Sequence, residues 1–130
     1  MSVGNGGDIP MTRVLIVEDE FLIRLMLSES LADEGYDVAE ASSGEQALGI
    51  LADDPSAVDL VLTDIQLGAA MNGYELARRL RELTADLPII FMTGRPEVAA
   101  ERLTTRDRFV AKPYLPSEIC AVARELLATG

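Results

Sequence analysis

Residues 58–64, VDLVLTD, form a mostly apolar run that ends in the carboxylate Asp64. Short runs of this kind are typical of strands buried in a parallel sheet. Three more such runs also end in reactive polar groups: residues 14–17 before Glu18 and Asp19, residues 89–92 before Thr93, and residues 109–111 before Lys112 and Pro113. Because the carboxyl ends of parallel strands border the crevice where ligands bind, we expect these side chains to share one site.

The composition limits the classes of function. A length of 130 residues fits a single domain, and a net charge of −11 argues against direct DNA binding, which needs clustered lysine and arginine. The chain has no histidine and one cysteine, Cys120, which excludes histidine-based triads and multi-cysteine metal sites. No apolar stretch reaches the ~18 to 20 residues of a membrane helix, and no signal peptide is recognised, so we expect a cytoplasmic protein without a membrane partner.

The order of the segments predicts the fold class. Residues 1–11 are expected to be a flexible leader, and residues 12–130 the domain. Within the domain, short apolar runs alternate with amphipathic segments, which predicts five strand-helix units and an α/β fold with a parallel sheet. The predicted strands are residues 13–17, 37–40, 59–63, a run starting at Pro88, and 108–111. The predicted helices are residues 20–33, a segment from Ser43 to residue 52, 74–83, a short segment after Pro96, and the final segment.

Apolar spacing also predicts which helix faces meet the core. Phe21, Leu25 and Ala32 form one stripe on the first helix, and Gly35 follows as a C-terminal cap. The second strand is rather polar, as at a sheet edge. One face of the last helix carries four apolar residues: Leu115, Ile119, Val122 and Leu126.

The clustered carboxylates indicate a metal site. At about 4 Å and an effective dielectric of 20, each like-charge pair costs ~4 kcal/mol, so Glu18, Asp19 and Asp64 need a cation to be ionised together. Mg²⁺ suits them best, because it binds one or two carboxylates together with a substrate phosphate. One carboxylate can then act as a nucleophile and form an aspartyl phosphate, while Mg²⁺, Lys112 and Thr93 stabilise the transferring group.

Each residue also has an ordinary structural interpretation. Asp19 fits a helix cap, and Asp64 fits a turn former. Thr93 before Gly94 fits a strand-to-helix cap, and Lys112 before Pro113 fits an exposed lysine at a turn. The site hypothesis is favoured because all of them fall at the same edge of successive predicted strands.

Taken together, residues 12–128 resemble the receiver domain of two-component response regulators. The resemblance matches the acidic pair of that family to Glu18 and Asp19, the phosphoacceptor to Asp64, and the conserved lysine to Lys112. It also matches the switch residues to Thr93 and Phe109. It implies a doubly wound, flavodoxin-like five-stranded sheet in order 2-1-3-4-5 with helices on both faces, and a cis Lys112-Pro113 bond.

The resemblance further implies how the site works. Asp19 and Asp64 would ligate Mg²⁺ directly, the backbone carbonyl of Gln66 would supply a third ligand, and Glu18 would act through water. Asp64 would receive its phosphoryl group from a sensor histidine kinase or a phosphotransfer protein. Thr93 and Lys112 would then move toward the phosphoryl group and alter an outer face.

Two stretches depart from the usual receiver pattern. Residues 67–73 lack a proline common in this loop and have one extra residue. Residues 91–94, FMTG, and 112–114, KPY, resemble a receiver subgroup, which makes Tyr114 a second candidate for the switch aromatic.

The expected output is binding to a downstream protein partner, or phosphorylation-dependent dimerisation, through residues 96–102 and 114–120. A single-domain regulator of this kind is not an enzyme that turns over several substrates, and whether it relays phosphate, drains a kinase or binds an effector stays open. One rival hypothesis is a pseudo-receiver that binds partners without phosphorylation. Another is a Mg²⁺-dependent phosphohydrolase, although Gln66 occupies the place of its second carboxylate. The third, a flavodoxin-like nucleotide binder, lacks a glycine-rich phosphate loop. Cys120 is expected to pack rather than to react.

Overall fold

The computed structural model describes residues 11–68, 70–95 and 104–129. The described part of the chain forms five strands and four helices, in this order: β2 (Arg13–Val17), α1 (Phe21–Asp33), β3 (Asp37–Ala41), α2 (Gly44–Asp53), β4 (Leu60–Asp64), α3 (Gly73–Leu83), β5 (Ile89–Thr93), β6 (Asp107–Ala111) and α5 (Pro116–Thr129). Strands and helices alternate from β2 to β5. These bounds agree with the predicted ones to within one or two residues. The predicted segment after Pro96 lies outside the described residues, as do residues 1–10 of the predicted leader.

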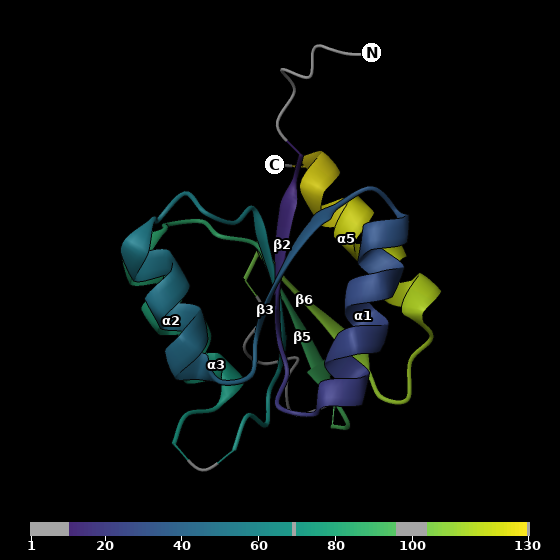
Figure 1. The fold of residues 1–130 in the computed structure, drawn as a ribbon, viewed down its shortest axis with the longest axis horizontal. Coiled ribbons are helices and arrows are strands. Elements are labelled where there is room, and N and C mark those ends of the chain that lie inside the picture. Colours follow the sequence, from purple (N-terminus) through teal and green to yellow (C-terminus); the bar gives the residue numbers. More distant parts are fainter. Residues whose placement is uncertain (1–10, 69, 96–103, 130) are drawn as a thin grey trace.

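The five strands form one parallel sheet in the order β3-β2-β4-β5-β6. In chain order this is 2-1-3-4-5, which confirms the order implied by the resemblance, and the polar strand β3 lies at an edge as predicted. The pairing aligns the strand ends, because Val17 lies opposite Thr63, Asp64 opposite Met92, and Thr93 opposite Ala111. The reactive groups after these strands therefore emerge at one edge of the sheet, the lower one in Figure 1.

Helices cover both faces of the sheet, so the doubly wound fold is confirmed. Figure 1 shows α2 and α3 on one side of the strands, and α1 and α5 on the other. Each side has its own apolar cluster, because alternate strand residues point to opposite faces. Leu15, Val61 and Ile89 join the cluster under α2 and α3. Val14 and Leu62 join the one under α1 and α5.

The predicted stripe on α1 was wrong. Phe21 is 60% exposed and Leu25 37%, whereas Leu27, Ser28 and Leu31 are buried. Ala32 is also exposed. The first two turns of α1 are apolar on nearly every side, so the apolar spacing does not define a face there. Packing against the sheet and α5 determines which side is buried.

The face of α5 was predicted in part. Ile119 and Leu126 are buried, but Leu115 precedes the helix and is 64% exposed. Val122 is partly buried, and Cys120 and Ala123, which the prediction did not include, also lie in the core. The burial of Cys120 agrees with the packing role expected of it.

Local sequence signals mark the end of α1 and the start of α2. Gly35 follows α1 with φ +98°, a conformation that glycine adopts at little cost, so the predicted cap is confirmed. The Ser43 hydroxyl accepts a hydrogen bond from the Gln46 backbone N–H at the start of α2, at 3.1 Å.

No helix in the described ranges has the length and apolar character needed to cross a bilayer.

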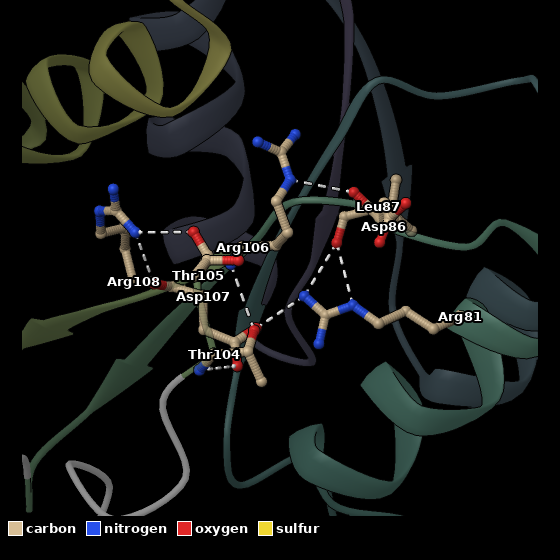
Figure 2. Close-up of polar contacts among 8 residues, drawn as sticks. All are labelled: Arg81, Asp86, Leu87, Thr104, Thr105, Arg106, Asp107 and Arg108. Carbon is tan, nitrogen blue, oxygen red and sulfur yellow. Dashed lines mark hydrogen bonds and ion pairs between the residues drawn. The ribbon is translucent and has the colours of Figure 1, made fainter. Parts of the chain in front are cut away.

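A buried ion pair fastens α3 to the edge of the sheet opposite the site. Asp107, the first residue of β6, is 3% exposed, and its Oδ1 lies 2.6 Å from Arg81 Nη2. The same guanidinium donates two hydrogen bonds, of 3.1 and 2.8 Å, to the Leu87 carbonyl, and Asp107 Oδ2 accepts one from the Thr104 N–H (Figure 2). The end of α3 is therefore tied to the segments that enter β5 and β6.

Candidate functional site

Asp64, the last residue of β4, has both carboxylate oxygens engaged. The side chain is 6% exposed, and its Oδ1 accepts a 2.9 Å hydrogen bond from the Gln66 backbone N–H. Its Oδ2 lies 2.5 Å from Lys112 Nζ. Lys112 is the only lysine in the chain. The cis peptide bond between Lys112 and Pro113 is present, as the resemblance implied.

The acidic pair follows β2, beside Asp64. Glu18 is 1% exposed, and its Oε2 accepts a hydrogen bond from the Glu20 N–H at 3.1 Å. Its Oε1 is buried and has no hydrogen-bond partner among the described residues. Burial raises the pKa of Glu18 from 4.5 to about 7, and Asp19 and Asp64 add to this rise.

These residues fit a magnesium ion. A buried carboxylate oxygen without a partner, next to two further carboxylates, is an arrangement that a divalent cation relieves. In the described ranges, no three acidic, histidine or cysteine side chains converge closely enough to hold a metal by themselves. The set implied by the resemblance needs only Asp19 and Asp64 as direct carboxylate ligands, with the Gln66 carbonyl and water, and Mg²⁺ accepts such a set.

The raised pKa of Glu18 predicts how stability depends on pH. The folded, metal-free protein binds the Glu18 proton more tightly than the unfolded chain does, so this contribution is complete below pH 4.5. It is lost as the pH rises through about 7. Urea unfolding in EDTA should therefore show a free energy of unfolding that falls over this range more steeply for the wild type than for Glu18→Gln. Excess Mg²⁺ should remove this difference between the two proteins. Equal pH dependence of the wild type and Glu18→Gln in EDTA would contradict the raised pKa of Glu18.

Two hollows meet at Asp64. The first, of about 330 Å³, has eight lining residues: Asp64, Ile65, Gln66, Tyr74, Thr93, Gly94, Arg95 and Lys112. The second, of about 770 Å³, lies on the side of the acidic pair. Its lining residues are Asp19, Glu20, Asp64, Ile65, Gln66, Gly68, Asn72 and Lys112. The structure therefore brings the predicted Asp19, Asp64, Gln66, Thr93 and Lys112 to the same place.

The switch candidates lie on different sides of the sheet. Thr93 ends β5, is 7% exposed, and its hydroxyl accepts a hydrogen bond from the Arg95 N–H at 2.9 Å. Phe109 stacks on Phe91 with 5.1 Å between ring centroids, on the side of α2 and α3. Tyr114 packs on the side of α1 and α5, and burial raises its pKa to about 12. Their roles in switching stay predictions.

The loop after Asp64 is anchored by its ends and by apolar side chains. The Ile65 N–H donates to the Met92 carbonyl, and the Gly73 N–H donates to the Ile65 carbonyl, at 3.1 and 2.7 Å. Leu67 and Met71 are each 7% exposed. Residue 69, within this loop, lies outside the described residues.

Gly73 is a residue whose importance the sequence patterns did not indicate. A Cβ atom there would lie 2.6 Å from the Asp64 carbonyl oxygen and 2.9 Å from Ile65 Cα, which are both backbone atoms. Only glycine lets the first turn of α3 approach the backbone of Asp64 and Ile65 this closely. The available signal was a glycine directly before the predicted helix of residues 74–83, a position that the sequence assigned to the preceding loop.

Gly73→Ala should lower the free energy of unfolding by about 1–3 kcal/mol, because the backbone that carries Asp64 must shift. The matched control is Gly49→Ala in α2, where a Cβ would meet nothing within 4 Å. That variant should be about 0.5–1 kcal/mol more stable than the wild type, since alanine is the better helix former. Urea titrations of the three proteins check this, and equal stability of the two variants would refute the close approach.

The fold and the site define a doubly wound α/β domain with carboxylates clustered at the carboxyl ends of its strands. The family model described as "Response regulator receiver domain" matches residues 14–124. The chain therefore belongs to the receiver domain family of two-component response regulators, which confirms the resemblance found in the sequence. Membership of the subgroup with the FMTG and KPY motifs stays a prediction.

Individual relatives agree with this family. The chain is 39% identical over 118 residues to the aerobic respiration control protein ArcA of Escherichia coli strain K12, covering 88% of this chain and 48% of that protein. It is 38% identical over 119 residues to the phosphate regulon transcriptional regulatory protein PhoB of Pseudomonas aeruginosa, covering 88% and 51%. The chain thus spans about half the length of these curated relatives. A crystal structure of a response regulator receiver protein from Sinorhizobium medicae WSM419 superposes with a TM-score of 0.83 and 26% identity, covering 91% of this chain and 95% of that one.

Proposed function

We propose that this receiver domain accepts a phosphoryl group on Asp64 in a Mg²⁺-dependent reaction and signals by binding a protein partner. The observation that carries the proposal is the Asp64 carboxylate itself. It is nearly buried, lies 2.5 Å from the single lysine of the chain, and faces hollows bordered by Thr93 on one side and Asp19 on the other.

Each side chain has a defined task in the transfer. An Asp64 oxygen attacks phosphorus, and the bond from phosphorus to the donor breaks, so an acyl phosphate forms. The Lys112 ammonium and the Thr93 hydroxyl stabilise negative charge on the phosphoryl oxygens. Asp19, Asp64 and the Gln66 carbonyl would hold Mg²⁺, with Glu18 acting through water, and the ion would supply positive charge to balance the carboxylates and the phosphoryl oxygens.

Exposed apolar side chains follow two of the strands whose carboxyl ends form the site, and we take them as the surface that meets a protein donor. Phe21 and Leu22, the first two residues of α1, are 60% and 74% exposed, and Leu25 is 37% exposed. Leu115, shortly after Lys112, is 64% exposed. Apolar side chains gathered at one edge mark interaction sites more often than scattered ones do. We assign this surface to a sensor histidine kinase or phosphotransfer protein, which supplies the histidine that the chain lacks.

The surface that binds the downstream partner and the cellular location are proposals as well. Residues 114–120 are the described part of the predicted partner or dimer interface, whereas residues 96–102 lie outside the described residues. The domain is proposed to act in the cytoplasm as a signalling module, with residues 12–130 as its unit. These assignments follow from the family and from the composition.

A pseudo-receiver is the second candidate. It is favoured by the departures of residues 67–73 from the usual receiver pattern, if this loop prevents metal binding. Such a protein would bind its partner without Mg²⁺ or phosphate. The phosphohydrolase hypothesis is weaker, because the position of its second carboxylate is held by Gln66, an exposed amide.

Intact mass spectrometry after incubation with acetyl phosphate separates these candidates. A receiver should gain one labile phosphoryl group in Mg²⁺ and none in EDTA or in the Asp64→Asn variant. A phosphohydrolase should instead release phosphate with continuous turnover. If the wild type gains no phosphoryl group from acetyl phosphate or from a histidine-phosphorylated donor, the pseudo-receiver is the better description.

A further inference from the structure

Tyr74 stands between the acceptor hollow and a second hollow on the same side of the sheet. It is the second residue of α3 and lines the hollow of Asp64, Thr93 and Lys112. It also lines a separate groove of about 400 Å³, whose other walls include Phe91 and Asp107. One aromatic ring is therefore a wall of both spaces.

The ring is held from several directions. Its centroid lies 5.3 Å from that of Phe91 and 6.3 Å from that of Phe109, in tilted arrangements typical of packed aromatic pairs. The preceding Gly73 fixes the start of α3 against the backbone of Asp64 and Ile65. The position of Tyr74 is thus set by the segment that carries the acceptor.

The far end of the same helix is fastened independently. Arg81, seven residues after Tyr74 and hence on the same side of α3, binds the buried Asp107 and the Leu87 carbonyl (Figure 2). Both Tyr74 and Arg81 line the groove. With both ends of this helix face held, the Tyr74 ring has little freedom to leave the acceptor hollow.

Building on the proposed phosphoryl acceptor, we propose that the Tyr74 ring shields the aspartyl phosphate from water that enters by the α3 groove. In hydrolysis, a water oxygen bonds to phosphorus while the bond from phosphorus to the Asp64 oxygen breaks. The products are the Asp64 carboxylate, inorganic phosphate and a proton that passes to solvent. An aromatic wall slows this step by limiting the access of water to phosphorus. Tyr74 thus controls how long the signal lasts, whereas Lys112 and Thr93 act on its formation.

The test measures the lifetime of the phosphorylated protein in a graded series of Tyr74 variants. Wild type, Tyr74→Phe, Tyr74→Leu and Tyr74→Ala are phosphorylated with acetyl phosphate and Mg²⁺, the donor is removed, and phosphoprotein is followed by intact mass. The control is Leu83→Ala, a truncation of a 40% exposed side chain at the other end of α3. Phosphoryl uptake is measured in parallel, because general damage to the fold would slow uptake as well.

The proposal predicts a lifetime about three- to tenfold shorter for Tyr74→Ala, an intermediate one for Tyr74→Leu, and near wild-type values for Tyr74→Phe and Leu83→Ala. Uptake should remain close to that of the wild type throughout. Equal lifetimes across the series would overturn it, and so would a Tyr74→Phe lifetime as short as that of Tyr74→Ala. If Tyr74→Ala does not fold, Tyr74→Leu against Tyr74→Phe decides. A wild type that takes up no phosphoryl group would overturn the proposed function instead, and this inference with it.

Discussion

Arg81→Met should lower the free energy of unfolding by about 3 kcal/mol, because it removes the cation from a buried carboxylate and leaves that charge without compensation. Asp107 is 3% exposed, and its other described partner is the Thr104 N–H. Methionine keeps much of the length of the arginine stem, so the loss reports the charge and the hydrogen bonds to Leu87 rather than a cavity. The value is set at the lower end of the usual range because the Arg81 side chain is 24% exposed.

A matched variant on the same helix isolates the effect of burial. Arg78 also forms ion pairs, with Glu75 and Glu82, but its side chain is 63% exposed. Arg78→Met should therefore change stability by less than about 1 kcal/mol. Combining Arg81→Met with Asp107→Asn should cost less than the sum of the single changes, because the stranded charge is then gone. Urea unfolding of this set would contradict the account if both arginine variants lost the same stability.

Lys112→Ala should slow phosphoryl uptake by about 10²–10³-fold, the usual effect of removing one group that stabilises charge in a transition state. The Lys112 ammonium lies 2.5 Å from Asp64 Oδ2. Under the proposed function it orients the acceptor and binds the incoming phosphoryl oxygens. Initial rates with acetyl phosphate and Mg²⁺ give the measurement.

Lys112→Arg tests whether the positive charge alone is sufficient. It keeps the positive charge but replaces a compact ammonium with a planar, wider guanidinium, which fits a different geometry. Its uptake rate should fall between those of the wild type and Lys112→Ala. Near wild-type uptake by Lys112→Ala would show that the contact between Lys112 and Asp64 has no part in the transfer.

The strands and their ends could be predicted from the sequence because they depend on local signals. Runs such as residues 58–63 are apolar enough to need burial on both faces, and each stops at a polar residue. The parallel arrangement then places Asp64, Thr93 and Lys112 at one edge. The order of the strands could not be predicted in this way. It was implied by the resemblance to receiver domains and not by the apolar pattern.

What could not be predicted depends on contacts between distant segments. The buried face of α1 is chosen by the sheet and α5, because its first turns are apolar nearly all round. Gly73 matters through its closeness to Asp64, and Tyr74 through two hollows that exist only in the folded chain. Asp107 looks like an ordinary exposed residue before a strand, yet it is buried against Arg81, 26 residues earlier.

The most direct test of the account is to identify the phosphorylated residue chemically. The protein is phosphorylated with acetyl phosphate and Mg²⁺, treated with borohydride, which reduces an acyl phosphate to an alcohol, and digested for peptide mass spectrometry. The account predicts homoserine at position 64 and nowhere else, with none in EDTA. Homoserine at Asp19 or at another carboxylate, with Asp64 unmodified, would contradict the assignment of Asp64 as the acceptor.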